Sequence, residues 1–299
     1  MLKKLNFIIF VMLVIMAGSG ICAIYSDYQP GPRPSAMGGA GVAVADDVDA
    51  VYWNPAGLGL IQNNEIGFQH SNVFNVGIYQ EYLSLVHPLG KGVGIGFAWI
   101  HHDANLEEGF LTTSRTNKWD DDVYILGFGT KLRENAALGL NIKRYMINTK
   151  ITSGGTAAGA GIGFDVSLLI KSKKQFSELN IKDIKYGIML RNVATDFNSE
   201  KPNIEYKIGI SAKIMDEILG AFDLVSTDDD KGDRDYLVYV GAEYNVNKNF
   251  ILRMGLNDGS FTAGLGIKYL EKVKINYSFQ SKLSDVGEDN HKFSLSYLF

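Results

Sequence analysis

Cysteine and proline are scarce in this sequence, and each shortage excludes a class of structure. Cys22 is the only cysteine among 299 residues, so the chain has no disulfide framework and no zinc site built from cysteines. Three of the 6 prolines lie close together at Pro30, Pro32 and Pro34, so few strand breakers remain elsewhere. With 33 glycines, 16 Phe and 15 Tyr, the composition favours long strands rich in glycine and aromatic residues.

Excess positive charge and long apolar runs are also missing. The formal net charge is −4 at pH 7, which argues against a nucleic-acid-binding protein, because such proteins need a basic face. After an N-terminal leader, no apolar stretch reaches the roughly 18 residues that indicate a transmembrane helix. A transmembrane β-barrel is not excluded, because its apolar residues alternate with polar ones.

Residues 1–23 are expected to be a secretory signal peptide. Lys3 and Lys4 precede a short apolar run, and Ala23 is a suitable last residue before cleavage. In an alternative interpretation, Cys22 becomes a lipidated N-terminus. Either version exports the chain.

From residue 64 onward the hydrophobic period is two, as in β-strands with one apolar face. The clearest segment runs from Val273 to Gln280, where apolar and polar residues alternate without interruption. Most such segments are roughly as long as the ~9–11 residues that a tilted strand needs to cross a membrane. Fourteen strands are expected, near residues 64–72, 80–88, 92–102, 121–132, 136–148, 157–170, 184–193, 204–214, 217–225, 236–245, 250–257, 260–270, 273–282 and 290–299.

The connections between these strands alternate between tight turns and longer polar loops. This asymmetry is typical of an antiparallel outer-membrane β-barrel, whereas a large soluble β-sandwich, the alternative, predicts none. Lys171–Asp183, long among the tight turns, and Asn257–Gly259, tight among the loops, depart from the pattern. An even number of strands places both termini on the short-turn, periplasmic rim. The longer connections include residues 102–120, 149–156, 194–203 and 226–235.

The final strand ends the chain on an aromatic residue and carries a full apolar face. Phe293, Leu295, Tyr297 and Phe299 alternate with polar residues. This pattern resembles the C-terminal signal by which the barrel-assembly machinery recognises outer-membrane barrels. The resemblance implies that machinery and outer-membrane lipid as partners.

Residues 24–63 differ from the strands that follow. A run of small residues begins at Met37, Gly38 and Gly39 and ends at Asp46 and Asp47. An Asn-Pro-Ala turn with two further residues follows, at Asn54, Pro55, Ala56, Gly57 and Leu58. Small residues allow close backbone approach, and Asn before Pro favours an extended or turn conformation.

These two motifs resemble the PorV/PorQ family, whose members are similar to the FadL-type long-chain fatty-acid transporters. The resemblance implies a fourteen-stranded outer-membrane barrel (64–299) with an N-terminal hatch (24–63) in its lumen. It also implies that Asn54, Pro55 and Ala56 lie inside the barrel. Family members pass hydrophobic molecules through the outer membrane or, as PorV does, serve protein secretion.

Two function classes follow from the resemblance. In the first, the chain binds or transports a hydrophobic small molecule, and the ten hatch residues named above are candidate site residues. Met37, Val42, Val44 and Leu58 would offer apolar contacts, unless they only pack the hatch. In the second, the chain is a component of a secretion apparatus that binds proteins on its long-loop rim. A structural barrel without cargo is a third possibility.

No enzyme, metal or cofactor is expected. Neighbouring residues on a strand face opposite ways, so His101 and His102 cannot chelate a metal together. The acidic stretch Asp228–Asp233 resembles a calcium loop but has Gly232 where an acidic ligand is needed. The sequence contains no G-x-S-x-G motif and no legible Ser/His/Asp arrangement.

Overall fold

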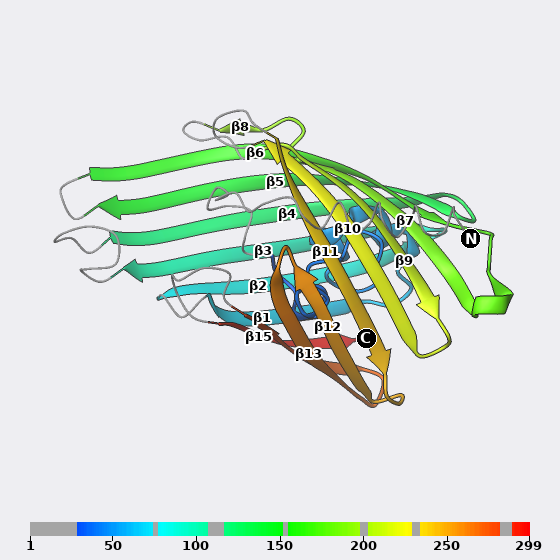
Figure 1. The fold of residues 1–299 in the computed structure, drawn as a ribbon. Helices are drawn as coiled ribbons and strands as arrows, with labels where there is room; N and C mark the ends of the chain where they lie inside the picture. Colours follow the sequence, from blue (N-terminus) through cyan, green and yellow to red (C-terminus); the bar gives the residue numbers. More distant parts are fainter. Residues whose placement is uncertain are drawn as a thin grey trace.

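The computed structural model describes residues 29–73, 77–106, 117–151, 155–197, 203–228, 234–281 and 289–299. Within them, fourteen long antiparallel strands form one closed barrel (Figure 1). Long strands that follow one another in the chain pair with each other, and the first strand pairs with the last to close the ring. The strands are β1 (Glu65–Val73), β2 (Ile78–Gly90), β3 (Val93–Leu106), β4 (Asn117–Arg133), β5 (Ala136–Ile151), β6 (Gly155–Lys171), β7 (Ile181–Arg191), β9 (Glu205–Ile214), β10 (Ile218–Asp228), β11 (Arg234–Asn245), β12 (Phe250–Asn257), β13 (Ser260–Tyr269), β14 (Val273–Gln280) and β15 (Asn290–Leu298).

The predicted barrel of fourteen strands is confirmed, and every predicted strand overlaps an observed one. The main difference concerns the expected loop 102–120. There β3 continues to Leu106 and β4 begins at Asn117, because the two strands stay paired in one register as far as Leu106 and Asn117. Two smaller elements accompany the barrel. They are the two-residue strand β8 (Asp196–Phe197), which pairs with β6, and the 3₁₀ turn η2 (Ser177–Leu179) between β6 and β7.

The period of two in the sequence sets which side chains face out. Outward positions are apolar and exposed, as at Leu126, Met254 and Ile208. The four apolar residues of the last strand are among them, with exposed fractions between 43% and 59%. Most inward positions are small or polar, and Gln69 and Asn141 are completely buried. Large apolar residues such as Tyr82 and Ile125 face inward where they pack against the N-terminal segment. The barrel therefore has an apolar exterior and a largely polar interior.

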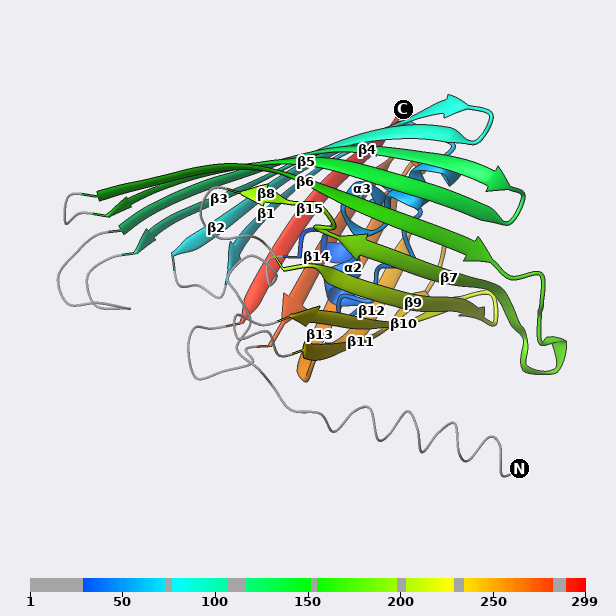
Figure 2. The same cartoon turned by 90° about the horizontal axis from the view of Figure 1, so that it is seen from above.

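Residues 29–64 run inside the barrel and fill much of its lumen; we call this segment the hatch (Figure 2). It contains the short helices α2 (Pro32–Ala36) and α3 (Ala50–Trp53) and the 3₁₀ helix η1 (Pro55–Leu60). Proline begins both α2 and η1, where its missing N–H costs nothing. No helix in the described part of the chain is long and apolar enough to span a membrane.

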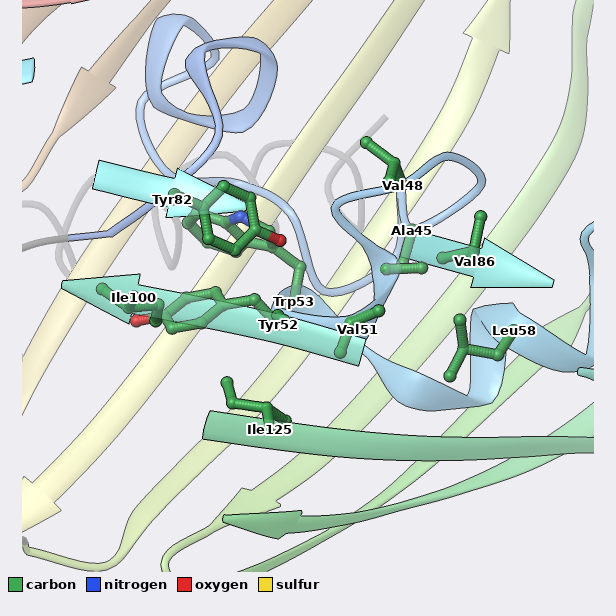
Figure 3. Packing of buried hydrophobic residues seen from close by; sticks show 12 residues of the cluster. Ala45, Val48, Val51, Tyr52, Trp53, Leu58, Tyr82, Val86, Ile100 and Ile125 are labelled. Carbon is green, nitrogen blue, oxygen red and sulfur yellow. The ribbon is translucent and has the colours of Figure 1, made fainter. Parts of the chain in front are cut away.

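The main hydrophobic cluster lies between the hatch and one side of the wall (Figure 3). Side chains from the hatch, including Tyr52, Trp53 and Leu58, pack against the inward faces of β2, β3 and β4. The indole N–H of Trp53 also donates to the carbonyl oxygen of Pro30 over 2.9 Å. Burying one such large side chain contributes about 2–3 kcal/mol. Apolar packing against the wall therefore stabilises the hatch in its position inside the barrel. The wall residues of the cluster include Tyr82, Val86, Ala98, Ile100 and Ile125.

The two ends of the described chain lie at different depths. The amide N–H of Phe299 donates to the carbonyl oxygen of Asn64 over 3.0 Å, on the short-turn rim. Gln29, in contrast, contacts Asn257 at the long-connection end of β12. Lys292 of β15 also donates to the backbone carbonyl of Gln29. The predicted signal peptide (1–23, with Cys22) and residues 229–233 of the acidic stretch lie outside the described residues.

The long-connection rim is uneven. β4 and β6 have 17 residues each, whereas β12 and β14 have 8. Figures 1 and 2 both show the strands of the β3–β6 side extending past the rest of the barrel.

Candidate functional site

The hatch touches the wall where inward positions are glycine. A Cβ atom on Gly139 would lie 2.1 Å from the backbone nitrogen of Ala56, and one on Gly241 would lie 2.2 Å from the carbonyl oxygen of Met37. Such contacts leave no space for any side chain. The glycines that alternate with apolar residues in the sequence therefore form the seat of the hatch. Others in this seat are Gly94, Gly129, Gly187 and Gly255.

Asn54 fixes the turn that the sequence predicts. Its side chain is completely buried, accepts a hydrogen bond from the Ala56 amide over 3.1 Å, and donates to the Val42 carbonyl over 2.7 Å. Ser167 of β6 accepts a second hydrogen bond from the same amide over 3.0 Å. One asparagine thus caps η1 and joins it to an earlier part of the hatch.

The ten predicted hatch residues occupy three separate places. Met37, Gly38 and Gly39 lie against β11, β12 and β13. The motif from Asn54 to Leu58 lies against β3 to β6. Asp46 and Asp47 take part in an ion-pair network. The structure therefore does not bring these residues together into one binding site.

The four apolar residues expected to contact a ligand are all covered by protein. Met37, Val42, Val44 and Leu58 are at most 5% exposed. Met37 and Val44 pack against Tyr239 and neighbouring wall residues. In this arrangement they pack the hatch against the wall, and a cargo would reach them only if the hatch moved.

Arg33 is the central residue of that ion-pair network, and the sequence analysis missed it. Its guanidinium lies 2.6 Å from Asp46, 2.7 Å from Asp47 and 2.9 Å from Glu243 of β11. Arg253 of β12 lies 2.8 Å from the same Glu243. Burial alone would lower the pKa of Arg33, but the three carboxylates outweigh burial and raise it well above its usual value. A lone arginine among prolines was the only sequence signal.

A cavity of about 580 Å³ opens on the short-turn side of this network. We call it the vestibule. Its walls carry charges of both signs, including Lys185, Lys274 and Glu65. Lys274 lies 2.9 Å from Glu65, and Lys185 lies 3.4 Å from Asp46. The vestibule is thus a polar, ion-paired space that suits water and charged groups better than an apolar molecule.

Buried ion pairs also line the lumen on other sides. Lys143 and Asp165 are each 1% exposed at the side chain and lie 2.5 Å apart. Glu205 pairs with both Lys207 and Arg191, at 2.9 and 3.2 Å. The lumen therefore carries charges of both signs, and in these pairs they neutralise each other locally.

Two aspartates of the hatch have opposite pKa shifts, which gives a pH prediction. Burial, with the nearby charges of Asp47 and Glu65, raises the pKa of Asp49 well above its usual value. Burial acts in the same direction on Asp46, but Arg33 and Lys185 outweigh it and lower that pKa. Asp49 therefore destabilises the seated hatch as the pH rises above about 4, because it loses its proton more readily when the hatch is unseated. Ionised Asp46, in contrast, stabilises the seated hatch.

We expect Asp49→Asn to stabilise the seated hatch at pH 8 and Asp46→Asn to destabilise it. The gain from Asp49→Asn should disappear below the ordinary aspartate pKa of about 4, because Asp49 is then protonated in both the folded and unfolded states. The loss in Asp46→Asn should persist below pH 4 and fade only as the pH falls through the lowered pKa of Asp46. Chymotrypsin cleavage of the hatch at Tyr52 or Trp53 reports the seating at pH 8, and pepsin, which is active in acid and also cleaves at aromatic residues, reports it below pH 4. Equal cleavage of the two variants at pH 8 would contradict the prediction.

Known proteins match this chain in structure but not in sequence. No protein-family model and no curated protein sequence matches it. The Ralstonia pickettii toluene transporter TbuX superimposes with a TM-score of 0.71 at 12% identity, covering 92% of this chain and 100% of TbuX. The Pseudomonas putida toluene transporter TodX gives 0.68 at 13% identity, covering 91% and 99%.

A Pseudomonas aeruginosa FadL homologue shares the fold more distantly, with a TM-score of 0.57 at 9% identity, covering 87% of this chain and 95% of the homologue. The chain therefore has the fold of the FadL-type transporters: a closed barrel of fourteen strands. The FadL-like expectation is confirmed for the fold. The finer resemblance to PorV/PorQ stays a prediction.

Proposed function

We propose that this protein is an outer-membrane channel for hydrophobic small molecules. The observation that carries the proposal is the combination of a closed fourteen-strand barrel, a fold shared with two toluene transporters, and a hatch that fills its lumen. No catalytic role is proposed for any residue.

The apolar outer surface of the barrel supports the proposal that the protein lies in a membrane. Exposed apolar side chains project from strands all around the barrel, and such a band on a closed barrel suits the lipid core. Outer-membrane lipid and the barrel-assembly machinery are therefore its proposed partners, with Phe293, Leu295, Tyr297 and Phe299 as the assembly signal. The proposed orientation places the short-turn rim in the periplasm.

The hatch and the vestibule limit the route that a cargo can take. An apolar molecule on the barrel axis would meet the seat of the hatch and then the ion pairs of Arg33. Passing uncharged carbon through such paired charges is unfavourable, since it separates them without replacing their partners. The cargo therefore passes either when the hatch moves or through a gap in the wall.

Uptake of radiolabelled toluene tests the proposal. Cells that produce the barrel should take up toluene severalfold faster than cells that produce an unrelated barrel of equal abundance. Heat-modifiable migration on SDS gels confirms folding in both. Equal uptake by the two strains would overturn the proposal.

An engineered disulfide distinguishes the two routes. A Cβ on Gly67 of β1 would lie 2.9 Å from Cγ1 of Val48 in the hatch, and a disulfide places a Cβ about 3 Å from the partner sulfur. Val48→Cys with Gly67→Cys should therefore lock the hatch. If the hatch must move, oxidation abolishes uptake and reduction restores it; if the route is through the wall, oxidation changes nothing. Val48→Cys alone is the control.

The alternative expectation, a secretion component acting through its long connections, stays a prediction. Residues 107–116, the middle of the longest expected connection, lie outside the described residues.

A further inference from the structure

His101, Asp120 and Asp122 gather on the outer surface of the barrel. His101 lies on β3, and the two aspartates lie on β4, which pairs with it. His101 Nδ1 is 3.1 Å from Oδ1 of Asp122 and 3.8 Å from Oδ1 of Asp120. One ligand atom from each of the three lies within 4.8 Å of the others. Ligand atoms bound to one metal ion at about 2.1 Å lie about 3.0–3.4 Å apart, so only a small adjustment of Asp120 is required.

The cluster is assembled by strand pairing and held by a tryptophan. His101 and Asp122 are direct cross-strand partners, and Asp120 is two residues along the same face of β4. The Trp99 indole stacks on the His101 ring at 5.5 Å, and its N–H donates to Oδ1 of Asp122 over 2.7 Å. One side chain thus orients two ligands, as outer-shell groups do at metal sites.

Two further carboxylates, those of Asp103 and Glu81, lie beside the cluster, and Glu81 already has His70 as a partner, with 2.6 Å between Oε1 and Nδ1. Asp103 lies directly opposite Asp120, and Glu81 of β2 lies directly opposite His101. Like charges directly opposite on one face of a sheet repel each other. Oδ1 of Asp103 and Oε2 of Glu81 are shielded from solvent and have no hydrogen-bond partner among the described residues.

The position of the cluster leaves it open on one side. The outward apolar rows of β3 and β4, with Phe97, Leu126 and Phe128, end just below it on the short-turn side. The side chains of His101 and Asp122 are 25% and 21% exposed, and that of Asp120 is 41% exposed. Three protein ligands at this boundary leave coordination positions for water or a phosphate oxygen.

We propose that His101, Asp120 and Asp122 form a divalent-metal site on the outer wall of the barrel, at the edge of its apolar band. One imidazole with two carboxylates suits a borderline ion such as Zn²⁺ better than Ca²⁺, which takes six to eight oxygen ligands. His101 and His102 do point apart, since His102 contacts the inward-facing Gln80 at 2.9 Å. The ligands come from the paired strand instead.

Calorimetry with ZnCl₂ on the full-length barrel, purified without a histidine tag, tests the site. The parent should bind one more equivalent of Zn²⁺ than a variant carrying His101→Gln, Asp120→Asn and Asp122→Asn. His101→Gln or Asp122→Asn alone should weaken that equivalent at least about tenfold, and CaCl₂ should bind more weakly than ZnCl₂.

His291→Gln is the matched control. His291 is also an exposed outward histidine near the long-connection rim, but its Nδ1 contacts the Tyr277 hydroxyl rather than a carboxylate. This variant should keep the full Zn²⁺ stoichiometry. Every variant must show the heat-modifiable migration of the parent. Equal stoichiometry in the parent and the folded triple variant would overturn the proposal, as would a loss in His291→Gln as large as in His101→Gln.

Discussion

Replacing Arg33 with methionine should release the hatch from the vestibule side. The substitution removes the one cation that contacts Asp46, Asp47 and Glu243 together. Removing one member of a buried ion-pair network costs about 3–5 kcal/mol, because the remaining charges stay uncompensated. The side chain of Arg33 is 15% exposed, so we expect the lower end of that range. Methionine keeps an apolar stem of similar length, and so the packing changes little.

Single-channel recording in planar bilayers measures the effect. With its hatch loosened, Arg33→Met should open to a larger conductance, or open more often, than the parent. The barrel itself should stay resistant to SDS without heating, because its strand pairing is untouched. Lys185→Met is the control: Lys185 also contacts Asp46, but the pair is longer at 3.4 Å and partly exposed, and such pairs contribute about 0–1 kcal/mol. If the two variants conduct alike, the network does not hold the hatch.

The second large effect should come from a single added methyl group. In Gly139→Ala the new Cβ would lie 2.1 Å from the Ala56 nitrogen, and further wall and hatch atoms surround it. Backbone on both sides limits relaxation, so the hatch must shift. Overpacking of this kind costs about 1–3 kcal/mol. A cost of about 2 kcal/mol raises the population with an unseated hatch about thirtyfold.

Chymotrypsin cleavage at Tyr52 or Trp53 reports that population, because both side chains are buried while the hatch is seated. Cleavage of Gly139→Ala should be faster by about the same factor. Gly220→Ala is the matched control, since Gly220 is also a strand glycine but its added Cβ would meet only Ile214, at 3.4 Å. Equal cleavage of the two variants would show that the contact at Gly139 does not limit seating.

The local alternation of apolar and polar residues in the sequence predicted the barrel well. Strand positions depend on alternation within about ten residues, and the closed ring depends on the contrast between turns and loops. The strand ends near residues 103–106 and 117–120 were not predicted, because outward positions there, including Asp103 and Asp120, are polar and do not continue the apolar face. Their pairing is a property of two strands in register, which a single segment does not display.

The hatch was predicted only through resemblance, and its anchoring was not predicted at all. Arg33 and Glu243 are 210 positions apart, and nothing local relates them. The outward metal cluster had a partial signal. Once His101 is placed on a strand and residues 120–122 on the next, their shared face follows from register. Predicting that register, however, requires knowing where β3 ends and β4 begins, and the sequence pattern did not define these two strand ends.

The contacts of Lys292 connect the wall of the barrel to the beginning of the hatch. Its amine reaches the Gln29 carbonyl and the Ser35 hydroxyl, the latter over 3.0 Å. It belongs to β15, which pairs with β1 and so closes the ring. The first described residues of the hatch are thus bound in part by a side chain of β15. Removing β15 would therefore take away two things at once: the pairing that closes the ring and the Lys292 contacts with the hatch. The integrity of the wall and the retention of the hatch are linked through this one strand.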